Sequence, residues 1–129
     1  MKLQKVVNPQ FEIKVKVSYV EHESKPEEGY HLFSYRIFIK NNSSFTAQLN
    51  SRHWIITDNA GKTEEVRGAG VVGQQPRITP KETFEYESVC PLNCSSGSMR
   101  GYYQMISDTG ESFDIEIPEF YLVAPTSLH

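Results

Sequence analysis

The sequence predicts an all-β protein built as a sandwich of two antiparallel sheets. Apolar and polar residues alternate with a period of two along most of the chain, which is the pattern of half-buried strands. Turn-forming residues recur about every 8–12 positions, and no stretch carries the 3.6-residue apolar stripe of an amphipathic helix. About seven to nine short strands with this spacing pack best as two facing sheets.

Two strands, each with one polar face, are predicted near the amino end. Phe11–Tyr19 alternates apolar residues with charged residues and serine. A polar break follows at residues 21–29, and the alternation resumes over residues 31–39. Residues 41–44 form a turn, because asparagine and serine side chains bond to the local backbone.

Shorter strands are predicted in the rest of the chain, each bounded by turn-forming residues. A run that contains the lone Trp54 ends at a turn over residues 58–61. The segment 90–97 is predicted to be a loop, and Pro118 is expected to interrupt a strand. Strands are predicted over residues 45–57, 63–67, 113–117 and 120–123, the last as an edge strand. A further strand starts with Phe84, Tyr86 and Ser88, and another contains Tyr103 and Met105 and stops at the turn 108–110.

One domain accounts for the whole chain. Its 129 residues include 13 basic and 16 acidic side chains, a net charge of −3, and 12% aromatic residues. The balanced charge argues against binding nucleic acid through bulk charge, and the aromatic content is incompatible with disorder. No apolar run approaches the ~20 residues of a membrane helix, so no membrane contact is expected. We predict a single domain over residues 1–129, with a core at about 8–125 and frayed ends.

One local pattern favours a sandwich of the immunoglobulin or fibronectin type III kind. Tyr103 precedes the apolar Met105 by two residues. At this offset such sandwiches place a tyrosine that bonds back to the chain at a strand corner. An ordinary strand tyrosine is the alternative. No cysteine pair is placed to span the sheets, so an antibody-type domain is not expected.

A glycine-rich segment is the most conspicuous motif. Gly68, Gly70 and Gly73 match G-x-G-x-x-G, which in dinucleotide-binding folds brings the backbone close to a pyrophosphate. That fold needs a helix directly after the glycines, and Pro76 and Pro80 leave no room for one to start. No dinucleotide site of that kind is therefore expected.

Two interpretations of the glycine segment remain. The glycines can supply positive φ angles in tight turns between strands. Alternatively, a concave row of backbone N–H groups can hold a phosphate-type anion beside Arg67 and Arg77, which flank the segment.

The second candidate site centres on Arg52 and Trp54. Alternation places both side chains on one strand face with Ile56. Trp54 fits the core, since a lone tryptophan in a sandwich usually fills the space between the sheets. If exposed, it would form with Arg52 an anchor for a protein partner. The predicted partner-binding residues are Arg52, Trp54, Gln75, Met99 and Tyr102.

Neither a metal site nor a catalytic site is predicted. The four histidines lack metal-ligand spacing, although His22 and His31 flank one hairpin and could meet there. No G-x-S-x-G elbow, H-E-x-x-H pattern or P-loop lysine is present. Acidic residues are scattered on polar strand faces, where they protect edges. The histidines are His22, His31, His53 and His129.

The amino end and the cysteines indicate the compartment. Residues 1–9 carry lysines without an apolar stretch behind them, so we predict no secretion signal and a cytoplasmic protein. Cys90 and Cys94 then stay reduced, and two thiols are fewer than the four ligands of a structural zinc site. Exposed sheet edges also leave a homodimer open.

The chain resembles the ApaG family over residues 8–125. The motifs that carry the resemblance lie at residues 51–58, 68–76, 98–103 and 113–118. The combination G-V-V-G-x-Q-P with a later M-x-G-x-Y is far more specific than the glycines alone. The resemblance implies a fold similar to fibronectin type III sandwiches and a small, stand-alone bacterial protein of the cytoplasm.

The resemblance also implies what the protein does. The family is linked to cobalt resistance and magnesium efflux, and its eukaryotic relatives join the domain to F-box adaptors or to a DNA-polymerase-delta-interacting protein. No agreed enzymatic activity attaches to it. Its glycine loop, here Gly68, Gly70 and Gly73, has been suggested to contact pyrophosphate or nucleotides. We therefore predict a non-enzymatic binding module without a cofactor, which meets a protein partner; the alternative is an anion, pyrophosphate or nucleotide at the glycine loop.

Overall fold

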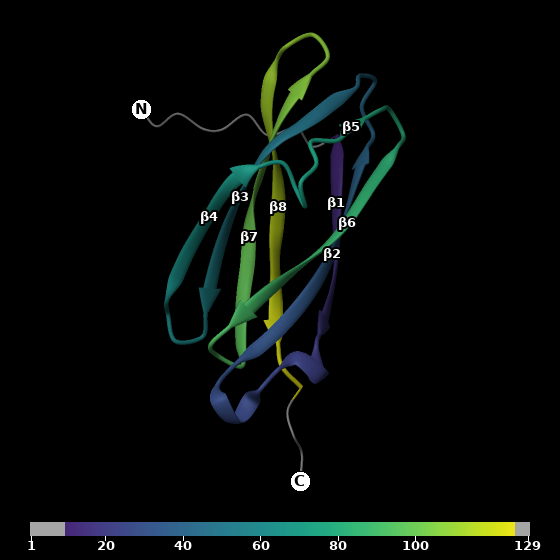
Figure 1. Ribbon diagram of the computed structural model, residues 1–129. Helices are drawn as coiled ribbons and strands as arrows, with labels where there is room; N and C mark the ends of the chain where they lie inside the picture. The colour runs from purple at the N-terminus through teal and green to yellow at the C-terminus, as the bar shows by residue number, and fades with distance from the viewer. Residues whose placement is uncertain (1–9, 126–129) are drawn as a thin grey trace, which may run out of the picture.

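Two antiparallel sheets face each other in the computed structural model, which describes residues 10–125 (Figure 1). The first sheet has the order β1-β2-β6, and the second has the order β4-β3-β7-β8, with β5 paired to β3 beside β4. The first sheet comprises β1 (Phe11–Tyr19), β2 (His31–Asn41) and β6 (Thr83–Leu92). The second comprises β3 (Ala47–Asp58), β4 (Thr63–Ala69), β5 (Arg77–Ile78), β7 (Ser96–Ser107) and β8 (Ser112–Val123). The predicted two-sheet sandwich is confirmed, and immunoglobulin and fibronectin type III domains share this architecture.

The strands after β5 are longer than the alternation predicted. The predicted loop at 90–97 is wrong, because β6 continues to Leu92 and β7 begins at Ser96. Cys90 stays in the ladder opposite Phe33. Pro118 does not end its strand, since the β7–β8 pairing shifts register near it and then continues. The polar break at 21–29 holds two short 3-10 turns, Glu21–Glu23 and Pro26–Glu28.

Aromatic side chains from both sheets fill the space between them. Trp54 is 3% exposed and packs edge-on against Tyr35 of the facing sheet, with ring centroids 5.5 Å apart. The hydroxyl of the buried Tyr103 hydrogen-bonds to the hydroxyl of Tyr86 across the core. The predicted strand-corner bond of Tyr103 to the backbone is therefore wrong, because its hydroxyl meets a side chain of the opposite sheet.

The two edges of the sandwich differ. At one edge β1 lies against β8, and three phenylalanines seal the contact. The ring centroid of Phe11 lies 5.4 Å from that of Phe113 and 6.1 Å from that of Phe45. At the other edge, β4 and β6 end the two sheets without pairing to each other. This second edge positions the candidate site.

Candidate functional site

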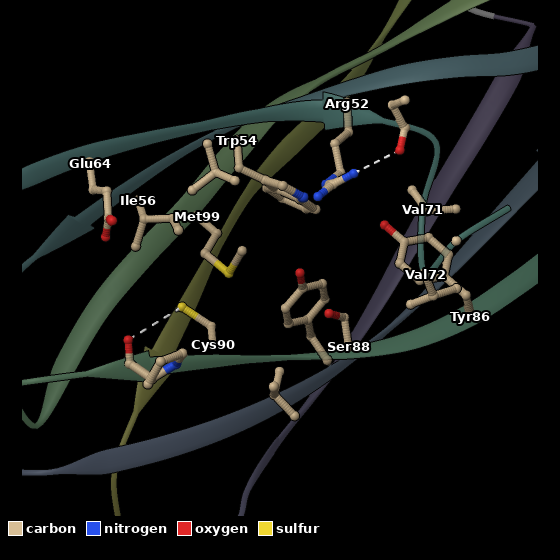
Figure 2. Close-up of a pocket in the computed structure, with 16 residues that line it drawn as sticks. Arg52, Trp54, Ile56, Glu64, Val71, Val72, Tyr86, Ser88, Cys90 and Met99 are labelled. Atoms are coloured by element: carbon tan, nitrogen blue, oxygen red, sulfur yellow. Dashed lines mark hydrogen bonds between the residues drawn. The ribbon is translucent and has the colours of Figure 1, made fainter. Parts of the chain in front are cut away.

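A groove of about 550 Å³ opens between the sheets at the edge formed by β4 and β6, and we call it the edge groove (Figure 2). Its volume lies within the range of about 300–1,000 Å³ that ligand pockets occupy. Its walls come from β2, β3, β4, β6, β7 and the loop after β4. The lining residues used below are Tyr35, Arg52, Trp54, Ile56, Glu64, Val71, Val72, Tyr86, Val89, Cys90 and Met99.

β3 presents its inward face to the edge groove. Arg52, Trp54 and Ile56 all line the groove, so their predicted placement on one face is confirmed. Trp54 is buried, which fits the core interpretation and makes the indole a wall of the groove rather than an exposed anchor. Met99 of β7 packs at the same depth, with 1% exposure.

Backbone carbonyls hold the guanidinium of Arg52 at one end of the edge groove. Its Nη1 donates to the carbonyl oxygens of Ala69 at 3.0 Å and Gly70 at 2.9 Å. Gly68 allows this position, because a Cβ there would lie 2.9 Å from Nη1. Within residues 10–125, no carboxylate lies at ion-pair distance from Arg52. The groove therefore offers a cation whose bonds inside the chain go to neutral oxygens.

Two exposed valines border the edge groove, Val72 in a loop and Val89 on the outer face of β6. Val72, in the loop after β4, is 51% exposed, and Val89 of β6 is 54% exposed. Val72 has a φ of +43° and is followed by Gly73 at +78°. Two positive φ angles in succession define a type I′ turn, in which a β-branched residue is strained. The chain thus displays an apolar side chain beside the groove at some conformational cost.

The walls between the two ends of the edge groove are neutral near pH 7. Burial, and secondarily Glu64, raises the pKa of the Cys90 thiol to about 11. Burial likewise raises the pKa of Tyr86 and Tyr35 above the usual value of a tyrosine. Glu64 lies at the end away from Arg52 (Figure 2). The groove therefore has a cation at one end, a carboxylate at the other, and an uncharged middle.

The glycine segment forms a tight hairpin. The N–H groups of Val71 and Gln74 donate to each other's carbonyl oxygens, both at 2.8 Å, and Gly70 N–H donates to the Asn50 carbonyl at 2.9 Å. Gly70 has a φ of +61°, and a Cβ there would lie 2.1 Å from the Gln74 carbonyl oxygen. Strand β5, and not a helix, follows the segment. The turn interpretation thus accounts for the segment's backbone.

The arginines predicted to flank an anion have other surroundings. Arg67 Nη2 donates to Glu65 Oε1 at 3.2 Å on the outer face of β4. Arg77 is an exposed residue of β5, opposite Gln48. The anion site at Gly68, Gly70 and Gly73 stays a prediction.

The predicted partner-binding residues separate into two groups. Arg52, Trp54 and Met99 meet in the edge groove. Gln75 instead donates through its side-chain amide to the Asn50 carbonyl at 2.8 Å, and Tyr102 lies on β7 opposite His53. The sequence analysis did not identify Val72 or Val89 as groove residues. For Val89 a signal was available, because a valine stands there at a position of the alternating strand that is otherwise polar.

The histidines and cysteines have separate surroundings. His31 is buried and hydrogen-bonds through Nδ1 to the Tyr19 hydroxyl at 3.0 Å, whereas His22 lies 3.5 Å from Glu23. Each of these histidines thus has a side-chain partner other than a histidine. Cys90 and Cys94 are free thiols, and Cys90 belongs to a strand rather than a loop. In the part of the chain that the structure describes, no three His, Cys, Asp or Glu side chains gather as metal ligands. His129 and the predicted frayed ends lie outside the described residues.

Comparison with known proteins places this sandwich in a family. The ApaG domain model matches residues 21–107. The chain belongs to the ApaG family. It is 59% identical to Protein ApaG of Bdellovibrio bacteriovorus over 127 residues, covering 98% of this chain and 100% of that protein. Protein ApaG of Rhizobium leguminosarum bv. trifolii is 49% identical over 114 residues, 88% of each chain.

Solved structures that superpose on nearly the whole chain share its fold. A crystal structure described as an ApaA protein of Bordetella pertussis superposes with a TM-score of 0.88 at 44% identity, covering 95% of this chain and 99% of that one. Among the described residues of the ApaG domain, no helix has the length and apolar character needed to cross a membrane. Membership therefore establishes the ApaG domain and its sandwich, and leaves its activity to be argued from the site.

Proposed function

We propose that this ApaG-family chain is a non-enzymatic binding module that holds a protein partner in its edge groove. The observation that carries the proposal is the combination of Arg52, which has no carboxylate partner among residues 10–125, and two exposed valines that border the groove. Apolar surface next to a half-buried arginine is typical of interaction sites. The rigid sandwich supplies preformed walls, so binding needs little ordering of the chain.

The chemistry of the groove favours binding over catalysis. Cys90, a thiol in its wall, has a pKa raised to about 11, so the reactive thiolate is scarce near pH 7. Trp54 and Met99 form buried apolar walls of the groove and carry no proton-transfer groups. These side chains suit complementarity to a partner more than bond making.

Affinity capture with paired variants tests the proposal. Val89→Glu puts a charge beside the groove, and Val123→Glu puts the same charge on β8, where Val123 is 64% exposed. We expect wild type and Val123→Glu to retain the same partner from a lysate of the source cell, and Val89→Glu to lose at least about tenfold, or about 1.4 kcal/mol. Equal capture by both variants, or turnover of a phosphorylated substrate by the pure protein, would overturn the proposal.

The cobalt and magnesium link that the family resemblance implies runs, in this proposal, through the partner. Hard cations prefer several convergent oxygen ligands, and the carboxylate in the edge groove is Glu64. We expect the melting temperature to be the same in magnesium, cobalt and ionic-strength-matched potassium chloride. A saturable rise with either divalent ion would instead favour a direct cation sensor.

Anion binding at the glycine loop is the competing function, and calorimetry separates the two. Pyrophosphate or ATP is titrated with and without magnesium at millimolar concentration, because a Kd of ~1 mM is only about −4 kcal/mol. The matched variant carries both substitutions, Arg67→Gln and Arg77→Gln. We expect no saturable heat from wild type, and heat that the double variant abolishes would favour the anion site.

The proposal also assigns the protein to the cytoplasm. Cys90 and Cys94 are both free thiols, and a reducing compartment keeps them so. Fractionation of the source cell tests this assignment, and recovery of the protein in a periplasmic or secreted fraction would contradict it.

A further inference from the structure

The backbone of β6 has polar groups facing the open edge that pair with no other strand of residues 10–125. Leu32 of β2 directs its N–H to Ser24 Oγ at 2.9 Å and its carbonyl to Val20 N–H at 2.8 Å, both on the β1 side. Its register partner on β6, Pro91, therefore points its backbone away from β2. Positions two and four residues earlier, Val89 and Glu87, share this orientation.

A hydrogen bond at the start of β6 gives the same orientation of its backbone groups. Asn41 N–H donates to the Glu82 carbonyl at 3.0 Å, so the even-numbered positions of this segment bond to β2. The N–H groups of Glu87 and Val89 thus face outward on an edge strand, next to the edge groove. Pro91 lacks an N–H and ends this accessible stretch.

A strand added to β6 would extend its sheet across the edge groove. Every second side chain of that strand would point between the two sheets, toward β3. On β3 the groove is lined by Arg52, Trp54 and Ile56, which are themselves two residues apart. The spacing of the site thus matches the spacing of inward side chains on an extended segment.

Charge decides which side chain faces which part of the groove. The added backbone would lie beside β6, so a side chain, rather than a chain end, reaches across to Arg52. Within the described chain that guanidinium has no carboxylate at ion-pair distance. Hydrogen bonds between arginine and a carboxylate are stronger than those between neutral groups. Trp54 and Met99 favour apolar side chains in the middle, while Glu64 disfavours a second acid at the far end.

The positions of Arg52 and Glu64 along β6 give the order of these side chains. Arg52 lies on the side of the groove where Tyr86 stands, and Glu64 lies on the side where Cys90 stands, so the cationic end lies at the start of the β6 stretch (Figure 2). A strand antiparallel to β6 therefore meets the Glu64 end first and Arg52 last. Its inward positions follow the order apolar, apolar, acidic at two-residue spacing.

We propose that the edge groove binds an extended partner segment by antiparallel strand addition to β6, with the pattern apolar-x-apolar-x-acidic and its acidic side chain on Arg52. This inference rests on the proposed function. Strand addition draws affinity from main-chain hydrogen bonds and specificity from alternate side-chain pockets.

Defined peptide pools test the inference. The probes are seven-residue peptides, acetylated and amidated so that chain ends carry no charge, with Val, Ile, Leu or Phe at apolar positions. One pool ends the pattern with Glu, one replaces that Glu by Lys, and one reverses the order. We expect the Glu pool to bind wild type at least tenfold more tightly than the Lys pool.

Variants of the groove cation and hydrogen exchange identify the binding mode. Arg52→Gln should abolish the preference for Glu, and Arg52→Lys, which loses the same guanidinium contacts but keeps a charge, should retain part of it. The tightest Glu peptide should slow exchange of the Glu87 and Val89 amides at least tenfold. Melting curves confirm that both variants are folded.

Each contrary outcome is specific. Binding without protection of the Glu87 and Val89 amides overturns strand addition and leaves the proposed function standing. Equal binding of the Glu and Lys pools overturns the role of Arg52, and preference for the reversed pool overturns the antiparallel order. No binding of any pool at about 1 mM peptide overturns the inference, while affinity capture still decides whether a partner exists. Concentration-dependent protection of these amides without peptide would show that a second copy of the chain supplies the strand.

Discussion

The two edges of the sandwich differ in how the space between the sheets ends. It is filled at the closed edge and left accessible at the open edge. At the closed edge, β1 and β8 approach each other, and the rings of Phe11, Phe45 and Phe113 fill the space between the sheets. At the open edge, β4 and β6 leave a groove of about 550 Å³, with Arg52 inside it. One edge completes the core, and the other leaves core-facing side chains within reach of a partner.

The difference shows how a sandwich can carry a binding site without loops of special length. Core residues such as Trp54 and Met99 extend to the open edge and become groove walls. The closed edge provides the packing that holds those walls in place. Substitutions at the closed edge should therefore affect stability, and substitutions at the open edge should affect binding.

The largest expected effect is at the closed edge. Phe113→Ala removes a ring that packs on both Phe11 and Phe45, so we expect a loss of about 3–5 kcal/mol in the free energy of unfolding. Val89→Ala at the open edge should change it by no more than about 0.5 kcal/mol. Urea denaturation measures both. A Val89→Ala loss comparable to that of Phe113→Ala would mean that the open edge is part of the core.

The second effect separates two glycines of the hairpin beside the groove. In Gly70→Ala the new Cβ would meet the Gln74 carbonyl oxygen at 2.1 Å, whereas in Gly73→Ala no heavy atom lies within 4 Å of it. Both positions have positive φ, so alanine is strained at each. We expect losses of about 2–4 kcal/mol for Gly70→Ala and about 1 kcal/mol for Gly73→Ala. Equal losses by urea denaturation would contradict the close-contact explanation.

The third effect is a pH dependence located in the groove wall. The Cys90 pKa, about 9 for an ordinary thiol, is raised to about 11 by burial, so the folded protein favours the neutral thiol. Its contribution to stability is fully present below pH ~9 and is lost as pH rises toward about 11. The slope there is at most about 1.4 kcal/mol per pH unit.

Denaturation of wild type and Cys90→Ala from pH 7 to 10.5 measures this contribution. Below pH ~9 the two unfolding free energies should differ by a constant amount, because the thiol is neutral in both states. Above it the wild-type value should fall more steeply. Parallel curves over the whole range would show that burial does not perturb the thiol.

Much of the fold could be predicted from local patterns. Strict alternation in Phe11–Tyr19 located β1 correctly, and the same rule placed Arg52 and Trp54 on one face. It failed in β7, because Gly97 and Gly101 interrupt the apolar positions while the ladder with β3 continues through them. Pairing with a neighbouring strand, which no local pattern contains, keeps those residues extended.

The site was harder to predict than the fold. Arg52, Trp54 and Met99 were predicted to be partner-binding residues, but their common location in a groove between two sheet edges was not predicted. Its walls come from strands that are distant in the sequence, so no motif joins Val72 to Val89. The partner assigned to Tyr103 also required knowledge of the facing sheet, since its hydroxyl bonds to Tyr86.

The smallest effect tests why the open edge keeps a strained residue. Val72-Gly73 occupies the central positions of a type I′ turn, where Asn-Gly is strongly preferred because asparagine tolerates positive φ. Val72→Asn should therefore raise the free energy of unfolding by about 1 kcal/mol. The same substitution removes an apolar side chain beside the edge groove, so it should weaken capture of the partner. A gain in stability with unchanged capture would mean that Val72 serves neither the turn nor the partner, and the apolar surface beside the groove would then be reduced to Val89. A gain in stability with weaker capture would show that the open edge keeps a strained valine because it contacts the partner. The closed edge, which binds no partner in this proposal, needs no such residue.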